Sequence, residues 1–198
     1  MAIFDLITDC ESITLSAERI ISDFDCGDID LNDFFNHKAL HYKEQLLAQT
    51  IFFRHNRTQK TVCAFSMSPN ALKTADLPGS RRKRVREFIP REKNLQSYPA
   101  FLIGRLGVAS EFNGQGIGSQ LIDYIKSYCL SNYPDFCRFL LIDAYNNSSV
   151  LSFYRKNNFL PVFSTEEQER KAYKIADSES LETRYLFFDM IHWKDKSG

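Results

Sequence analysis

Apolar residues recur along this chain with two periods, which together predict an alternation of strands and helices. The run from Ala100 to Ala109 is almost continuously apolar, as expected for a buried strand. A glycine-rich turn follows it. Beyond the turn, apolar residues stand at helical spacing: Leu121, Ile122, Ile125, Tyr128 and Cys129. This strand, turn and helix form the central part of the predicted fold.

Upstream, the pattern predicts a strand at 12–16, a helix, and then two strands at 49–53 and 61–67 joined as a hairpin. Asp28 or Asp30 is expected to cap the helix, which ends at about Leu47. The apolar face of that helix is predicted from residues spaced three or four apart: Leu31, Phe34, Phe35, Ala39, Tyr42 and Leu46.

Downstream, strands are predicted at 135–143, 159–163 and 185–191. Asn147 is expected to cap the helix that carries Tyr154, and Thr165 to cap a short acidic helix. The order β-α-β-β-insertion-β-α-β-α-β-α-β predicts an α/β protein (α+β mixed sheet) whose central mixed sheet is flanked by helices. The expected organisation is one domain, 1–198, with an insertion at about 69–99.

Composition narrows the class of protein. With 43% hydrophobic and 25% charged residues and a net charge of zero, the chain is ordinary globular material. Five cysteines without a C-x-x-C pair predict reduced thiols and a cytoplasmic location. No apolar run is long enough for a bilayer, so no membrane association is expected. His37 and His41 have helical ligand spacing but no third ligand nearby, so no metal site is predicted.

The insertion is strongly basic. Residues 81–93 contain seven positive and two negative side chains, which gives this segment a net charge of +5. One interpretation is a solvated surface, and the other is a contact with a polyanion such as nucleic-acid phosphates. The substrate contacts expected in the second case are Arg81, Arg82, Lys83, Arg84 and Arg86.

The turn after the central strand has the features of an anion site. Gly114, Gly116 and Gly118 allow a sharp turn and a close approach to a ligand, and the helix N-terminus attracts negative charge. No Gly-Lys-Ser/Thr closes the turn, so it is not a P-loop. Its spacing does not match a dinucleotide fingerprint. A glycine-rich turn without a ligand is the alternative.

The segment Asn113–Gly118 resembles the acyl-CoA loop of the GCN5-related N-acetyltransferases (GNAT), with Asn113 where Arg or Gln is usual. Phe153–Phe159 resembles the family's Phe-Tyr-x-x-x-Gly-Phe, with Asn158 in the Gly place, and Asp143–Asn147 resembles a strand exit of the family. The opening Phe24–Gly27, followed by Leu31–Phe35, resembles the bacterial toxin-like branch, which acetylates the amine of aminoacyl-tRNA.

This resemblance implies the GNAT fold, acetyl-CoA as cosubstrate, and Tyr154 as the acid that protonates the departing thiolate. The Val108 N–H would polarise the thioester carbonyl, and strand segments 106–109 and 140–144 would hold the pantetheine arm. No general base is evident from the sequence: Asp143 and Glu111 are candidates by position, and the alternative is that an α-amine, already partly neutral at pH 7, needs none. The cofactor-binding residues implied are Leu106, Gly107, Val108, Asn113, Gly114, Gln115, Gly116, Ile117, Gly118, Ser119 and Asn147.

The expected function is transfer of an acetyl group from acetyl-CoA to a primary amine, with charged tRNA as the favoured acceptor. A small-metabolite or protein amine is the alternative acceptor, and a non-catalytic acyl-CoA-binding regulatory module is the alternative class. A small antitoxin is the expected partner of a toxin-like member. The sequence leaves the acceptor and the oligomeric state open, with a homodimer among the options.

Overall fold

A computed structural model describes residues 4–75, 77–90, 95–176 and 178–197 of the chain. The strands are β1 (Cys10–Thr14), β2 (Gln49–His55), β3 (Thr61–Lys73), β4 (Ser97–Val108), β5 (Phe139–Tyr145), β6 (Leu160–Pro161) and β7 (Thr183–Asp189). They form one mixed sheet in the order β1-β2-β3-β4-β5-β7-β6, so the predicted fold class is confirmed.

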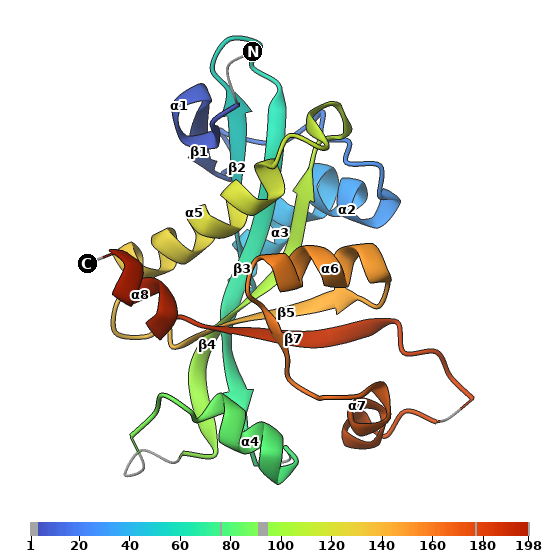
Figure 1. The fold of residues 1–198 in the computed structure, drawn as a ribbon. Coiled ribbons are helices and arrows are strands. Elements are labelled where there is room, and N and C mark those ends of the chain that lie inside the picture. Colours follow the sequence, from blue (N-terminus) through green and yellow to red (C-terminus); the bar gives the residue numbers. More distant parts are fainter. Residues whose placement is uncertain (1–3, 76, 91–94, 177, 198) are drawn as a thin grey trace. The chain divides into compact units, whose positions relative to one another are not determined.

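Helices lie in most of the connections between the strands, whereas β2 and β3 are joined by a loop (Figure 1). The α-helices are α1 (Leu6–Asp9), α2 (Ile29–Asp33), α3 (Ala39–Glu44), α4 (Gly79–Val85), α5 (Ile117–Asn132), α6 (Ser148–Lys156), α7 (Glu166–Tyr173) and α8 (Ile191–Ser197). A π-helical turn, η1 (Phe34–Lys38), joins α2 to α3, and a 3₁₀ turn, η3 (Ser110–Phe112), follows β4. No helix among the residues described is both long and apolar enough to cross a lipid bilayer.

The chain divides into two compact units. The first comprises Met1–Ser68 and Ile103–Ile125, and the second Pro69–Leu102 and Lys126–Gly198. In the first unit, β1 and β2 pair antiparallel from Cys10↔His55 to Thr14↔Ile51, and β2 and β3 form the predicted hairpin. The core of this unit combines residues of those strands with rings from the helical segment: Ile13, Leu15, Ile21, Phe24, Phe34, Phe35, Ala39, Phe52, Ala64 and Ala109.

In the second unit, β5 and β7 run side by side along their whole length, from Phe139↔Asp189 to Tyr145↔Thr183 (Figure 1). The short β6 adds to the other edge of β7 through Leu160↔Phe187 and Pro161↔Leu186. The core joins these strands to the insertion and to the chain before α7: Leu72, Leu77, Val85, Tyr98, Ala100, Phe139, Leu141, Val162, Phe163 and Phe187. The basic insertion is therefore packed into the unit by Leu77 and Val85.

The structure corrects two sequence predictions, the extent of the irregular insertion and the end of the first helix. Strand β3 continues beyond Met67 to Lys73, and β4 begins at Ser97. The irregular part of the insertion is therefore shorter than predicted. The first helix ends at Glu44, and Leu46, predicted on its apolar face, is 93% exposed with φ of +58°. Phe34 and Phe35, both predicted on the apolar face, are both buried. The π-helical turn accounts for the burial of two adjacent side chains, since its wider turn can direct both inward.

Candidate active site

The glycine turn that opens α5 is exposed and has an unusual backbone. Gly114 has φ of +76° and Gly116 φ of +78°, values that favour glycine. A Cβ at either position would meet nothing within 4 Å, so the requirement is conformational and the space above the turn is open. Ile117, only 1% exposed, anchors the helix start beneath it. The turn thus combines an open surface with a fixed helix N-terminus.

The first turn of α5 directs its amides toward that open surface. The Gly116 carbonyl accepts hydrogen bonds from the N–H groups of Ser119 (3.1 Å) and Gln120 (3.2 Å), which are the first bonds of the helix. Ile117 and Gly118 precede them and, by their position, have no intrahelical acceptor. Such N–H groups and the helix dipole favour an anion. Asn113 and Gln115 are exposed beside the turn.

The strand before the turn explains why Gly107 is a glycine. A Cβ there would lie 3.0 Å from the Phe24 ring and 3.4 Å from Cys26 Sγ, which is too close to the ring without movement. Beyond β4, the Ser110 N–H donates to the Asp25 carbonyl at 2.9 Å. Leu106 and Val108 are half-buried beside Gly107. The segment around Phe24 and Cys26 therefore packs directly on the end of β4.

Two asparagines hold that segment in place. Asn32 Oδ1 accepts from the Cys26 N–H (2.8 Å), and its amide donates to Asp25 Oδ1 (2.8 Å). Asn36 accepts from the Phe24 N–H (3.0 Å) and donates to the Phe24 carbonyl (2.8 Å). Hydrogen bonds from the Gly27 N–H and Asn32 lower the pKa of Asp25. The sequence signature at 24–35 thus has a structural role beside Gly107, which sequence analysis had not assigned.

Asn147 caps α6, as predicted. Its Oδ1 accepts from the Val150 N–H at 2.9 Å and from the Ser149 hydroxyl at 2.8 Å. Two residues after α6, Asn158 has φ of +66°, so the predicted left-handed turn is confirmed. The cap uses only the oxygen of the Asn147 side-chain amide, and the residue remains exposed.

Tyr154 lies on the inner face of α6 and is 8% exposed. Its ring contacts Phe153 (centroids 5.0 Å apart) and Phe159 (5.7 Å). Burial raises the pKa of the Tyr154 hydroxyl to about 12, so the hydroxyl is fully protonated at neutral pH. The residue is therefore a proton or hydrogen-bond donor with a fixed ring.

The arginines of the insertion are mostly engaged with the chain itself. Arg82 donates to three carbonyls, those of Thr74 (3.0 Å), Ala75 (2.7 Å) and Leu77 (3.1 Å). Arg81 donates to the carbonyls of Val162 (2.9 Å) and Pro161. These contacts fix the loop around α4 and leave the two guanidinium groups little freedom for another ligand.

The remaining charges of the insertion differ in exposure. Arg86 donates to Thr74 Oγ1 (3.1 Å) and to the Leu95 carbonyl (2.6 Å). Arg84 is exposed and pairs with Glu87 at 2.6 Å, and Lys83 is exposed. Arg91, Glu92 and Lys93, which also belong to the predicted basic segment, lie outside the described residues. Lys83 and Arg84 are thus the described charges best placed for an external anion.

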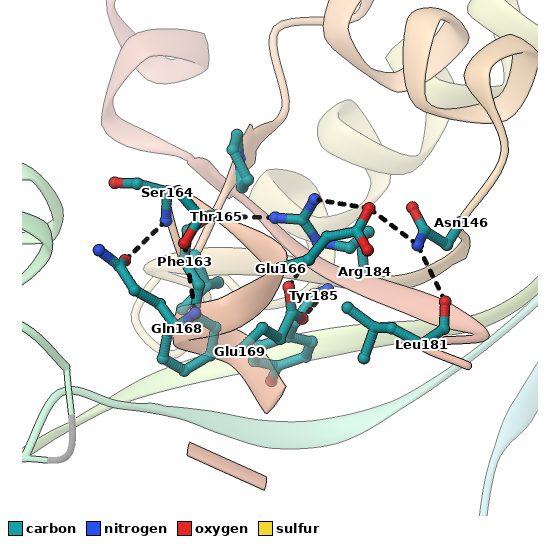
Figure 2. Close-up of polar contacts among 12 residues, drawn as sticks. Asn146, Phe163, Ser164, Thr165, Glu166, Gln168, Glu169, Leu181, Arg184 and Tyr185 are labelled. Carbon is teal, nitrogen blue, oxygen red and sulfur yellow. Dashed lines mark hydrogen bonds and ion pairs between the residues drawn. The ribbon is translucent and has the colours of Figure 1, made fainter. Parts of the chain in front are cut away.

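A buried ion pair secures β7, the strand next to β5 (Figure 2). Glu169, on α7 and 1% exposed, accepts from Arg184 Nε and from the Tyr185 N–H, both at 2.6 Å. Burial raises the pKa of the Glu169 carboxyl. Arg184 also donates to the Phe163 carbonyl at 3.3 Å. The sequence predicts a short acidic helix after Thr165 but not this contact, because Arg184 lies 15 residues from Glu169.

Comparison with known protein families finds one match, which covers part of the chain. Residues 86–161 match the family model described as "Acetyltransferase (GNAT) domain". The match includes the glycine turn, Asn147 and Tyr154. Residues 86–161 therefore resemble a GNAT acetyltransferase domain, in agreement with the resemblance found in the sequence.

One curated protein shares a short stretch of sequence with the chain, and several solved structures share its fold. The chain is 40% identical over 55 residues to N-alpha-acetyltransferase 60 of Xenopus tropicalis, a stretch that covers 27% of this chain and 23% of that protein. Among solved structures, a bacterial toxin shares the fold with a TM-score of 0.72 at 11% identity, covering 95% of this chain and 94% of the other. AtaT complexed with acetyl-methionyl-tRNAfMet gives 0.69 at 18% identity, with 96% and 100% covered. A mutant of KacT gives 0.70 at 16%, with 95% and 99% covered.

Proposed function

We propose that this protein is an N-acetyltransferase that moves an acetyl group from acetyl-CoA to a primary amine. The observation that carries the proposal is the exposed turn at Gly114 and Gly116 at the start of α5, inside the segment that matches the GNAT model. A related fold, AtaT, has been solved with acetyl-CoA. In this proposal the amides from Asn113 to Ser119 bind the pyrophosphate, and Leu106, Gly107, Val108 and Asn147 contact the rest of the cosubstrate.

The acetyl transfer forms one bond, from the amine nitrogen to the carbonyl carbon, and breaks one, from that carbon to sulfur. The neutral amine attacks the thioester carbonyl carbon, and the Val108 N–H stabilises the oxygen as it gains negative charge. The C–S bond then breaks, and the sulfur takes a proton while the nitrogen loses one. Tyr154 donates to the sulfur, and the proton released from the nitrogen restores the tyrosine hydroxyl through water. Asp143 and Glu111 remain candidates for accepting that proton first.

The raised pKa of Tyr154 limits how the proton is transferred. Burial raises the pKa of Tyr154 to about 12, above that of a free thiol at about 8.5, so complete transfer of its proton to the thiolate is unfavourable. A concerted exchange, in which the nitrogen's proton replaces the one that leaves, avoids a free tyrosinate. We therefore assign Tyr154 as hydrogen-bond donor to the developing thiolate, with the proton passing only as the nitrogen releases its own.

We favour the α-amine of a charged tRNA as the acceptor. The support is the likeness in fold to AtaT, which was solved with acetyl-methionyl-tRNAfMet, and the exposed charges of Lys83 and Arg84. A small antitoxin is the corresponding partner, since AtaT has been solved with the C-terminus of the antitoxin AtaR. A protein or small-metabolite amine is the second candidate, favoured by the local identity to N-alpha-acetyltransferase 60.

Calorimetric titration with acetyl-CoA tests the cosubstrate site through Gly116. Gly116→Ala adds only the left-handed strain, about 1 kcal/mol or slightly more, since the Cβ meets nothing. Gly116→Asp adds a negative charge at the same point, and Asp tolerates this backbone better than Ala does. We expect Gly116→Asp to abolish binding and Gly116→Ala to keep most of it.

Gly79→Asp is the charge-matched control, because Gly79 also has open space around its Cβ and has no left-handed φ. It should bind acetyl-CoA as the wild type does. If Gly116→Asp folds and binds acetyl-CoA with unchanged affinity, the turn is structural only and the proposed function loses its main support. A protein that binds acetyl-CoA but acetylates no amine is instead the regulatory module.

A further inference from the structure

A cavity of about 550 Å³ lies in the second unit, with no part of the glycine turn in its lining. Its lining brings together α6, β7, α8 and the segment after α4. The aromatic side chains are Phe88, Phe187, Phe188, His192 and Trp193. Arg155 and Asn158 supply polar groups at its edge, and both are exposed. The volume falls within the range of small-molecule sites.

The charges around this cavity leave a positive excess. Arg84 pairs with Glu87 at 2.6 Å, and Asp189 pairs with Arg138 at 2.8 Å, so both acids of the lining are neutralised. Arg155 makes no side-chain ion pair within the part of the chain that the structure describes. The cavity therefore favours an anionic group near Arg155.

A buried lysine occupies two of the aromatic rings. Lys126 is 1% exposed, and its Nζ lies 4.4 Å from the centre of the Phe188 ring and 4.7 Å from that of Trp193. Those two rings are thus already engaged by a cation, so they cannot form an aromatic cage for a second one. The half-exposed Phe88 ring, 51% exposed and 4.6 Å from His192, remains for stacking.

We propose that this cavity is a second binding site for a planar aromatic ring that carries a phosphate, the chemistry of a mononucleotide. The base stacks on the Phe88 ring, to which the His192 ring lies edge-on at an interplanar angle of 82°. The Asn158 amide meets the polar edge of the base, and Arg155 binds the phosphate with two parallel N–H groups. Free mononucleotides and a nucleotide within an RNA strand share this chemistry. The proposal is independent of the acetyl-CoA site.

Trp193 makes the test direct, because it is the only tryptophan of the chain and lines the cavity. Titration of the full protein with adenosine 5′-monophosphate should change the tryptophan fluorescence in a saturable way. Adenosine lacks the phosphate and ribose 5-phosphate lacks the ring, so each should bind at least about tenfold more weakly. Gly116→Asp should bind the mononucleotide like the wild type, which excludes the glycine turn as the source of the signal.

Arg155→Gln is the decisive variant, and Lys156→Gln is its matched control. Both remove one exposed positive charge from the last turn of α6, but only Arg155 lines the cavity. We expect the dissociation constant to rise roughly tenfold or more in Arg155→Gln and to stay within twofold in Lys156→Gln. Phe88→Ala, which removes the stacking ring, should also weaken binding.

A short single-stranded RNA in the same assay distinguishes the two sources. Tighter binding than the mononucleotide, with the same loss in Arg155→Gln, assigns the site to RNA, and equal or weaker binding assigns it to the free mononucleotide. The proposal is overturned if neither probe gives a saturable change, or if Arg155→Gln and Lys156→Gln bind equally well.

Discussion

Replacement of Glu169 by alanine tests whether the buried pair with Arg184 secures β7. The change leaves the Arg184 guanidinium, 12% exposed, without its 2.6 Å carboxylate, and the Tyr185 N–H without an acceptor. Breaking a buried pair in this way costs about 3–5 kcal/mol. Arg184 keeps the Phe163 carbonyl at 3.3 Å, so the lower end applies, about 3 kcal/mol.

Thermal unfolding followed by circular dichroism measures that loss. For a chain of this length, about 3 kcal/mol corresponds to a fall in melting temperature of roughly 6–12 °C. Glu166→Gln is the control, because Glu166 lies 4.0 Å from Arg184 and is 49% exposed, so its charge contributes about 0.5 kcal/mol or less. If Glu169→Ala melts within about 2 °C of Glu166→Gln, the buried pair does not hold β7 and the reasoning fails.

The pKa of Glu169 also predicts how its contribution to folding stability changes with pH. Burial raises the pKa of Glu169, so its folded-state value lies above its unfolded value of about 4.3. A group of this kind contributes stability that is fully present below the unfolded pKa and declines as pH rises through the folded pKa. The stability difference between the wild type and Glu169→Gln, which cannot titrate there, should therefore be larger at pH 4 than at pH 7.

The remaining predictions concern turnover and the insertion. Tyr154→Phe should lower kcat by about 10²–10⁴ and leave acetyl-CoA affinity unchanged, with Tyr145→Phe as control; equal turnover would remove Tyr154 from the mechanism. Since the pKa of Tyr154 is raised to about 12, its ionisation should cause no loss of activity between pH 7 and 9. Lys83→Glu with Arg84→Glu should weaken tRNA retention on filters and flatten its salt dependence, whereas unchanged retention would favour a metabolite or protein acceptor. Arg82→Ala should instead cost about 2–3 kcal/mol of stability on thermal unfolding, because it loses three carbonyl contacts; a loss under about 0.5 kcal/mol would contradict the structural role.

Features set by local chemistry were predictable from the sequence. Asn147 and Thr165 cap α6 and α7 as expected, because a capping side chain bonds the helix that it precedes. Asn158 was predicted in a left-handed turn because asparagine tolerates that backbone. The glycine turn and the order of strands and helices around it followed from the apolar periods.

Features set by distant contacts were not predictable. Arg81 and Arg82 looked like ligands for a polyanion, but Arg81 donates to carbonyls 80 and 81 residues away and Arg82 to nearby loop carbonyls. Lys126 stands within the apolar stripe of α5, and its contacts with the Phe188 and Trp193 rings and with the Asn157 carbonyl come from distant parts of the sequence. Leu46 fits the helical period, yet the helix ends before it. A periodic pattern cannot show what a side chain meets from another part of the fold.

The central claim is transfer of an acetyl group from acetyl-CoA to a primary amine, and mass spectrometry of the acceptor tests it most directly. Charged tRNA is incubated with acetyl-CoA and either the wild-type protein or Tyr154→Phe. The amino acid is then released from the tRNA and its mass is measured. A panel of free amines and peptide N-termini is treated in parallel. We predict one added acetyl group per acceptor amine with the wild type, formed at least about 10²-fold more slowly with Tyr154→Phe. Protein that binds acetyl-CoA but leaves every acceptor unmodified would contradict the claim.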